Sequence, residues 1–266
     1  MLSSPTARRQ AAMPDRLRIA FALGALLICT VLVGTVSAGA ARAETSATIT
    51  PSLSPDRLGA RAQLTLAIAF TGGALGVPDA LQQSVLKFPA GLSLDIPNLR
   101  SCSPARLQLR GVSGCPPQSR IGSGHAVAES YLGSQLTVES ATLWVFLGPL
   151  RNLQPTIEIF GEAYAPLGEQ MVLTANGLTY PAPYGEGLEL SLPPIPTVPH
   201  GSNASILTFS LTIGTNRRRS ADANAVLVPS RCPPGGFPFA AEFTYVDGAS
   251  GRALATVPCP TTTKRK

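Results

Sequence analysis

The chain has 266 residues, of which 14% are charged and 44% are hydrophobic, and its formal net charge is +6. The first 43 residues hold five Arg and one Asp, so residues 44–266 carry 16 basic and 14 acidic side chains, a net charge of only +2. Because no global basic field remains after residue 43, the composition argues against nucleic acid as a partner. Residues 44–266 are enough to bury one large all-β core or two small ones.

The N-terminal segment has the order of an export signal. Four Arg lie within the first eighteen residues, the uncharged and mostly apolar residues 19–41 follow, and small residues come next. Ala41-Arg42-Ala43 fits the small-x-small pattern that precedes signal-peptidase cleavage, so residues 1–43 are predicted to be a signal peptide cut between Ala43 and Glu44.

An uncleaved signal anchor is the alternative reading of the same segment. Residues 19–41 are long enough to span a bilayer, which needs about 20 apolar residues. Because the positive flank stays inside, the residues after Ala43 are expected outside the cytoplasm in both cases. Contact with a membrane is expected only through residues 19–41, and only if they are retained.

Four cysteines follow the signal: Cys102, Cys115, Cys232 and Cys259. An even number of cysteines in an exported chain predicts disulfides, here with three connectivities open. The two local pairs, Cys102–Cys115 and Cys232–Cys259, are favoured because each brackets a turn-rich stretch; their loops correspond to roughly 3 and 3.6 kcal/mol of stabilisation. A metal site is disfavoured, because the sequence has no C-x-x-C and its two histidines lie far from the cysteines.

Alternating apolar residues predict strands along most of the remaining chain. In the first of these segments Leu64, Leu66, Ile68 and Phe70 share one face. The segments are residues 63–70, 91–96, 139–148, 156–164, 188–192, 205–214 and 239–246. Gly- and Pro-rich turns separate them, and residues 79–88 are the one segment with a helical pattern.

The predicted fold is all-β, an antiparallel β-sandwich of ten or more short strands preceded by an N-terminal apolar helix. Residues 44–260 form its β domain, with a candidate internal boundary at the proline-rich residues 193–203. The polar, basic residues 261–266 are predicted to be a disordered tail.

Residues 87–124 resemble a segment of large exported proteins of high-GC Gram-positive bacteria. In that segment a P-x-G-L strand is followed by a cysteine, a short variable stretch and then C-P-x-x-S-x-I/V-G. The matching residues here are Pro89, Gly91, Leu92, Cys102, Cys115, Pro116, Ser119, Ile121 and Gly122. The resemblance implies a Cys102–Cys115 bridge in a β-rich extracytoplasmic module, and it implies no activity.

Candidate catalytic groups are weak in this sequence. Ser123 and His125 lack the nucleophile elbow of a serine hydrolase. A glycosidase needs a pair of carboxylates, for which the chain offers Glu129, Glu139, Glu158, Glu162, Glu169, Glu186 and Glu189. Most of these alternate with apolar residues and are therefore expected on a solvent face. Asp247 is expected in a hairpin turn, since no acidic cluster surrounds it for calcium.

Two surface features are candidate binding sites. Tyr180 and Tyr184 lie in a proline-rich turn and are able to form an aromatic platform for carbohydrate, although tyrosines beside prolines more often pack turns. Arg217, Arg218 and Arg219 are expected at a solvated hairpin tip, with contact to an anionic envelope polymer or lipid head group as the functional alternative.

The leading hypothesis is an exported, non-enzymatic binding or structural module of the cell envelope, without a cofactor. The expected partners are a cell-wall polymer, a polysaccharide or another surface protein. The alternatives are a secreted, glycosidase-like hydrolase with a carboxylate pair and a membrane-anchored accessory subunit.

Overall fold

The computed structural model describes residues 44–73, 76–96, 100–132, 134–164, 168–195, 203–214 and 225–260. The predicted signal and apolar helix, the tail at 261–266 and most of the candidate boundary at 193–203 lie outside these residues. Among the residues that are described, no helix is both long and apolar enough to cross a membrane.

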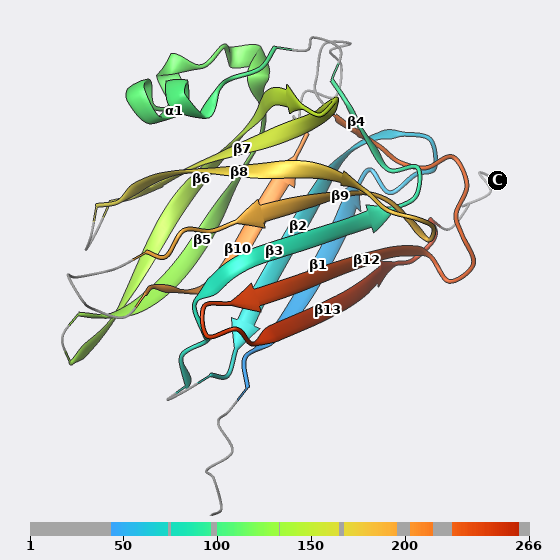
Figure 1. The fold of residues 1–266 in the computed structure, drawn as a ribbon. Helices are drawn as coiled ribbons and strands as arrows, with labels where there is room; N and C mark the ends of the chain where they lie inside the picture. Colours follow the sequence, from blue (N-terminus) through green and yellow to red (C-terminus); the bar gives the residue numbers. More distant parts are fainter. Residues whose placement is uncertain are drawn as a thin grey trace, which may run out of the picture. The chain divides into compact units, whose positions relative to one another are not determined.

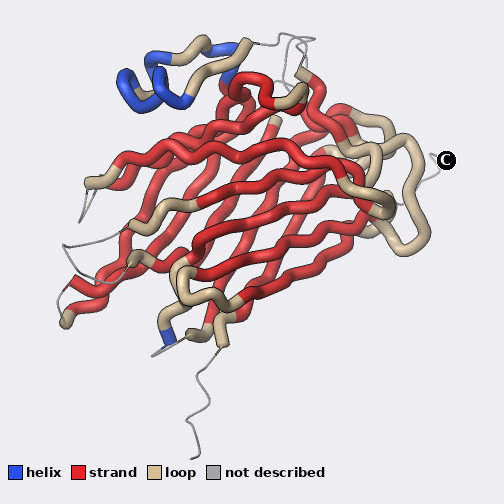
Figure 2. Tube along the Cα trace, in the orientation of Figure 1, coloured by secondary structure: helices blue, strands red, loops and turns tan. Residues whose placement is uncertain are grey.

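The described residues form thirteen strands and one α-helix (Figure 1; Figure 2). The strands are β1 (Ser46–Ser54), β2 (Arg61–Thr71), β3 (Leu81–Pro89), β4 (Ser93–Asp95), β5 (Arg120–Leu132), β6 (Gln135–Arg151), β7 (Gln154–Ala163), β8 (Gln170–Thr179), β9 (Tyr184–Ser191), β10 (Ser205–Ile213), β11 (Ala225–Leu227), β12 (Phe237–Tyr245) and β13 (Ser250–Val257). The helix α1 spans Pro104–Arg110.

All strand pairs are antiparallel, which confirms the expected all-β class. The hydrogen-bonded order is β13-β12-β3-β9-β8-β7-β6-β5-β10-β2-β11-β4, and β1 pairs with β2 off this path. The strands therefore belong to one continuous sheet. Strands from both sides of residues 193–203 pair with one another within it, as β10 does with β2 and β12 does with β3.

The sheet curls on itself. In Figure 1, β8, β9, β3, β12 and β13 form the nearer layer, and β10, β2 and β1 form the farther layer. The sheet passes from one layer to the other through β7, β6 and β5, and at the opposite side β1 lies beside β13. The inward faces of both layers therefore meet in one interior.

The alternation of β2 shows why this interior forms. Ala62, Leu64, Leu66, Ile68 and Phe70 are buried, while the residues between them are less so, as a strand with one face toward a core requires. β6 differs, because Val145 and Leu147 point inward while Phe146 is buried on the other face. The sequence predicted burial on both sides for this strand.

A disulfide-bridged segment covers that second face of β6. Cys102 and Cys115 are bonded, and Cys102 donates its backbone N–H to the carbonyl of Leu147 in β6 at 2.8 Å. With Leu107 of α1, the bridge packs against Phe146 and Phe160. The segment thus closes an apolar patch on the outside of the curled sheet.

Local signals explain α1, which the sequence analysis missed. The Ser103 side chain caps it by accepting the Arg106 N–H at 3.4 Å, and Pro104 occupies its first turn, where a missing N–H costs nothing. Gly111, at φ +58, follows the helix and donates its N–H to the Leu107 carbonyl at 2.7 Å.

Residues 79–88, read from the sequence as helical, instead form most of β3, because both edges of this segment are paired with β9 and β12. Tertiary pairing overrides a weak local pattern here. The second disulfide, Cys232–Cys259, links the segments before β12 and after β13. Both disulfides are therefore the local pairs that the sequence favoured.

Candidate functional site

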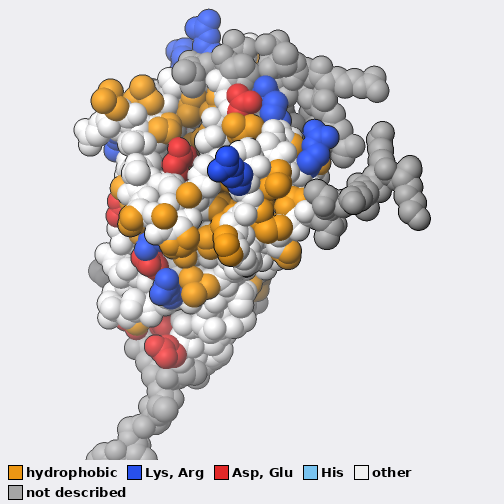
Figure 3. Space-filling view, turned by 90° about the vertical axis from the view of Figure 1, so that its right-hand side faces the viewer, with side chains coloured by type: hydrophobic (Ala, Val, Ile, Leu, Met, Phe, Trp, Pro, Cys, Tyr) orange, Lys and Arg blue, Asp and Glu red, His pale blue; other side chains and the backbone are white. Residues whose placement is uncertain are grey.

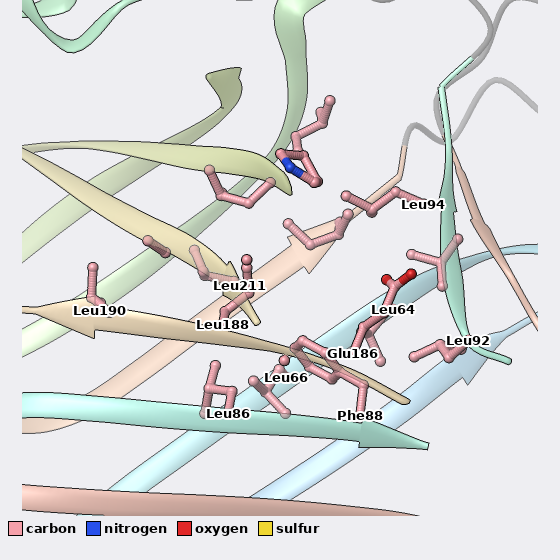
Figure 4. A pocket seen from close by; sticks show the side chains of 18 of the residues that line it. Leu64, Leu66, Leu86, Phe88, Leu92, Leu94, Glu186, Leu188, Leu190 and Leu211 are labelled. Carbon is pink, nitrogen blue, oxygen red and sulfur yellow. The ribbon is translucent and has the colours of Figure 1, made fainter. Parts of the chain in front are cut away.

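The interior of the curled sheet contains two cavities of about 130 Å³ each. The first lies between β2, β4, β7, β8, β9 and β10 and reaches the end of β3 (Figure 4). The second lies farther along the interior, between β5, β6, β8, β10 and the end of β2. An apolar cavity of about 150 Å³ is large enough to bind benzene, so each compartment has the size of a small apolar molecule.

The walls of both cavities are predominantly aliphatic. Figure 4 shows Leu64 and Leu66 from β2 and Leu188 and Leu190 from β9 around the first one. Three residues line both cavities, Leu86, Leu190 and Phe209, and they therefore form the partition between the compartments. The two compartments thus adjoin across these three side chains.

Glu186 is the one acidic residue among the described lining residues of the first cavity. It shares the inward face of β9 with Leu188 and Leu190, since side chains two positions apart point to the same side. Figure 4 shows its carboxyl group pointing into the cavity, toward β2 and the β3–β4 segment. Although Glu186 is exposed to solvent, its position at the cavity partly desolvates the carboxyl group and raises its pKa above the ordinary value of 4.5.

Other polar groups also lie at the two cavities. Ser93 and Gln154 join Glu186 at the first, and Gln154 donates from its Nε2 to the Thr179 hydroxyl at 3.5 Å. Ser84, Glu139 and Glu169 line the second cavity. Among the described lining residues of both cavities, none is Lys, Arg or His. The walls of the interior are thus mostly apolar, and the charged groups among their described residues are all carboxyl groups.

The outer surface near the first cavity carries many apolar side chains. Figure 3 faces the side of the molecule where β4 lies, and hydrophobic side chains gather there with a few scattered charges between them. Leu227 of β11 is 39% exposed. Leu150 at the end of β6 and Leu153 in the β6–β7 turn are also exposed, and this turn leads directly into Gln154 of the cavity wall.

The glutamates listed from the sequence are scattered over three environments. The expectation that most lie on solvent faces holds for Glu169 and Glu186, which are exposed although they also border the cavities, and it is wrong for Glu129 and Glu158, which are buried. Glu162 does lie at an exposed site, where it accepts from Tyr164 and Gln170. Glu189 accepts from Gln83 at 2.5 Å. Burial raises the pKa of Glu129.

Glu158 is fully buried, on the face of β7 opposite to the cavities. Its carboxylate accepts from the Thr156 hydroxyl at 3.0 Å and from the Thr174 hydroxyl at 2.5 Å. A Cβ at Gly148 would collide with these same oxygen atoms, so the backbone approaches the carboxylate closely. Glu158 is hydrogen-bonded within the fold, and neither cavity reaches it.

Tyr180 and Tyr184 lie in and beside the β8–β9 turn, both half-buried. The Tyr180 ring packs over Gly187, and the Lys87 ammonium lies 4.9 Å from its centroid while bonding Glu242 at 2.6 Å. Burial raises the pKa of the Tyr180 hydroxyl. The Tyr180 ring is thus engaged with its own fold on one side.

The remaining predicted residues are placed as follows. Glu44 is exposed at the start of the described chain, whereas Ala43 and Arg217 to Arg219 lie outside the described residues. Ser123 and His125 are exposed on β5. Asp247 accepts the backbone N–H of Ala249 at 3.0 Å, in the turn between β12 and β13. Over the described part of the chain, no group of three or more His, Cys, Asp or Glu is arranged to hold a metal ion.

Comparison of the chain with protein-family models, with curated proteins and with solved structures gave no match.

The cavities were not predicted, although the sequence contains one signal for them. Glu186 stands two residues before Leu188, and Glu139 stands four residues before Leu143, so each acid continues the inward face of its strand. An acid at an inward position costs free energy unless it is paired or reaches solvent. The even spacing between each acid and an inward-facing leucine could have identified both residues as candidates for an internal site.

Proposed function

We propose that this protein is an exported, non-enzymatic binding module whose ligand occupies the apolar interior of the curled sheet. The observation that carries the proposal is the pair of adjoining aliphatic cavities, each of about 130 Å³. Aliphatic side chains that border open space lack packing partners on one side and lose those dispersion contacts. A bound apolar molecule would restore the missing contacts, so a ligand would stabilise the folded chain.

The lining favours an apolar ligand over a polysaccharide. Sugar hydroxyls that enter an aliphatic space lose their hydrogen bonds to water and gain few in return. The tyrosine pair that the sequence proposed for carbohydrate is half-buried, and the Tyr180 ring is stacked with Lys87. A cell-wall polymer or a surface protein remains a proposed partner only for the outside of the module.

The location proposed for the module is outside the cytoplasm. The two disulfides suggest an oxidising environment, in which such bonds persist. We further propose cleavage between Ala43 and Glu44. N-terminal sequencing of the protein recovered from culture medium and from membranes should find Glu44 as the first residue. A chain that retains residues 19–41 would instead support the membrane-anchored alternative.

Binding can be tested with N-phenyl-1-naphthylamine, a neutral probe that fluoresces strongly in apolar surroundings. The purified protein should enhance its fluorescence in a saturable manner. Ala175 is 3% exposed and lines the first cavity, so Ala175→Leu should fill part of that space and weaken probe binding about tenfold.

The matched control is Asn176→Leu, which adds the same side chain at the next residue of β8, on its other face. This variant should bind the probe as the wild type does. Absence of saturable binding by the wild-type protein, or equal loss in both variants, would contradict the proposed function.

A hydrolase remains the second candidate because Glu139 and Glu169 line the same cavity. Two carboxylates are the minimum for glycoside hydrolysis, although the neighbouring walls are formed by side chains such as Phe70 and Leu143. Turnover of chromogenic glycosides that is abolished by Glu139→Gln would establish this candidate. We expect no turnover by the wild-type protein.

A further inference from the structure

We propose that the ligand is a straight-chain amphiphile whose head group is neutral or cationic and donates hydrogen bonds, held with its head beside Glu186 and its tail directed toward the second cavity. This inference rests on the proposed function, because it names the class of molecule that the interior takes up.

Charge selects the head group. Glu186 borders the first cavity from an exposed position, and Glu139 and the exposed Glu169 border the second. No described lining residue is basic, so an anionic head such as a fatty-acid carboxylate would meet like charge at either cavity. An ammonium or hydroxyl group instead supplies the donor that a carboxylate accepts.

The position of Glu186 selects the end at which the head lies. Its carboxyl group points into the first cavity beside leucines of β2 and of the β3–β4 segment (Figure 4). Ser93 and Gln154 provide further polar atoms in the same cavity. A head group beside Glu186 therefore has several hydrogen-bonding partners, while the alkyl tail of the ligand faces Leu188 and Leu190.

The two volumes determine the length of the tail. An apolar cavity of about 150 Å³ takes up benzene, a molecule of six carbon atoms, and each compartment here is about 130 Å³. A chain of about twelve carbon atoms would therefore occupy both compartments. To do so it passes the partition formed by Leu86, Leu190 and Phe209.

The experiment measures displacement of N-phenyl-1-naphthylamine from the purified protein at pH 7 by dodecylamine, dodecanol and dodecanoate, each below its micelle concentration. Dodecylamine and dodecanol should displace the probe at concentrations about tenfold lower than dodecanoate. Hexylamine should be a much weaker competitor than dodecylamine, because its tail is confined to one compartment.

Three variants locate the ligand. Glu186→Gln keeps the shape of the side chain but removes its charge, and it should reduce the tenfold preference for dodecylamine over dodecanoate to about twofold. Glu189→Gln, on the same strand with a partner in Gln83 outside the cavities, should leave the preference unchanged. Ala141→Leu, at the second cavity, should weaken binding of dodecylamine more than that of hexylamine.

The outcomes separate this inference from the proposed function. If the probe binds but dodecanoate competes as well as dodecylamine, the ligand class is wrong while the binding module stands. An equal preference in wild type and Glu186→Gln would show that the head group does not lie at Glu186. Absence of any probe binding contradicts the proposed function itself.

Discussion

The interior of the sheet has two halves of different composition. One half is built around buried aromatic residues of β2 and β12, namely Phe70, Phe237, Phe239, Phe243 and Tyr245. The buried residues of the other half, from β5 to β10, are Leu, Ile, Val and Ala in the described chain. Both halves face the same interior, yet most of the cavity walls belong to the aliphatic one.

The difference between the halves separates stability from binding. In the aromatic half, Phe70 and Phe243 meet edge to face at 5.0 Å between ring centroids, and Phe88 and Phe239 do so at 6.2 Å. Such pairs add about 0.5–1.5 kcal/mol to the burial of their surface. In the aliphatic half the side chains are smaller and leave open space, so we assign ligand binding to that half.

The largest expected effect is in the aromatic half. Phe239 is 1% exposed and lines neither cavity, so Phe239→Ala should lower the free energy of unfolding by about 3–5 kcal/mol. Leu173→Ala, beside the second cavity, should cost only about 2 kcal/mol, because a side chain next to a void has fewer contacts to lose. Urea denaturation measures both, and equal losses would remove the distinction between the halves.

The next effect concerns the covered outer face. Replacing Cys102 and Cys115 together by Ala should lower the free energy of unfolding by about 3 kcal/mol, because the bridge restricts the unfolded chain. N-phenyl-1-naphthylamine should still bind under native conditions, since this segment packs on the face of β6 opposite to the cavities. Loss of probe binding in a variant that remains folded would show that the segment shapes the interior.

The smallest effect is at Tyr245, at the margin of the aromatic half. Its hydroxyl is buried and has no hydrogen-bond partner among the described residues. Tyr245→Phe removes that uncompensated group and should raise the free energy of unfolding by about 1 kcal/mol. Thermal unfolding at neutral pH measures this change, and destabilisation by the phenylalanine would reveal a partner for the hydroxyl.

The same residue predicts a pH dependence. Burial raises the pKa of Tyr245 in the folded chain from its ordinary value of 10.0 to about 12, and nearby Asp79 adds to the shift. Because the unfolded chain releases this proton at lower pH than the folded chain does, the stabilising contribution is complete below pH 10 and is lost as pH rises toward 12. Tyr245→Phe should flatten the loss of stability in that range.

The strands were the most predictable part of this fold. The alternation of Leu64, Leu66, Ile68 and Phe70 identified β2 and its buried face, because a half-buried strand requires period two. The same rule failed to find β3, where Gln82, Gln83 and Ser84 interrupt the apolar pattern. Pairing with β9 and β12, distant in the chain, makes this segment a strand.

The candidate site was much less predictable. Glu186 could be assigned to an inward face from its spacing to Leu188, but whether that face borders a packed core or a cavity depends on the opposite layer. Leu66 and Leu211 reach the first cavity from β2 and β10 of that layer, and the distance between the layers follows from the curl of the whole sheet. Neither property is encoded in any local pattern.

The central claim is that one amphiphile occupies both cavities, and its most direct test is a crystal structure with dodecylamine carrying bromine on its terminal carbon. The anomalous signal of bromine should lie in the second cavity near Ala141, and the amine should lie beside Glu186. A bromine peak only on the outer surface, with water or rearranged side chains filling both cavities, would contradict the account.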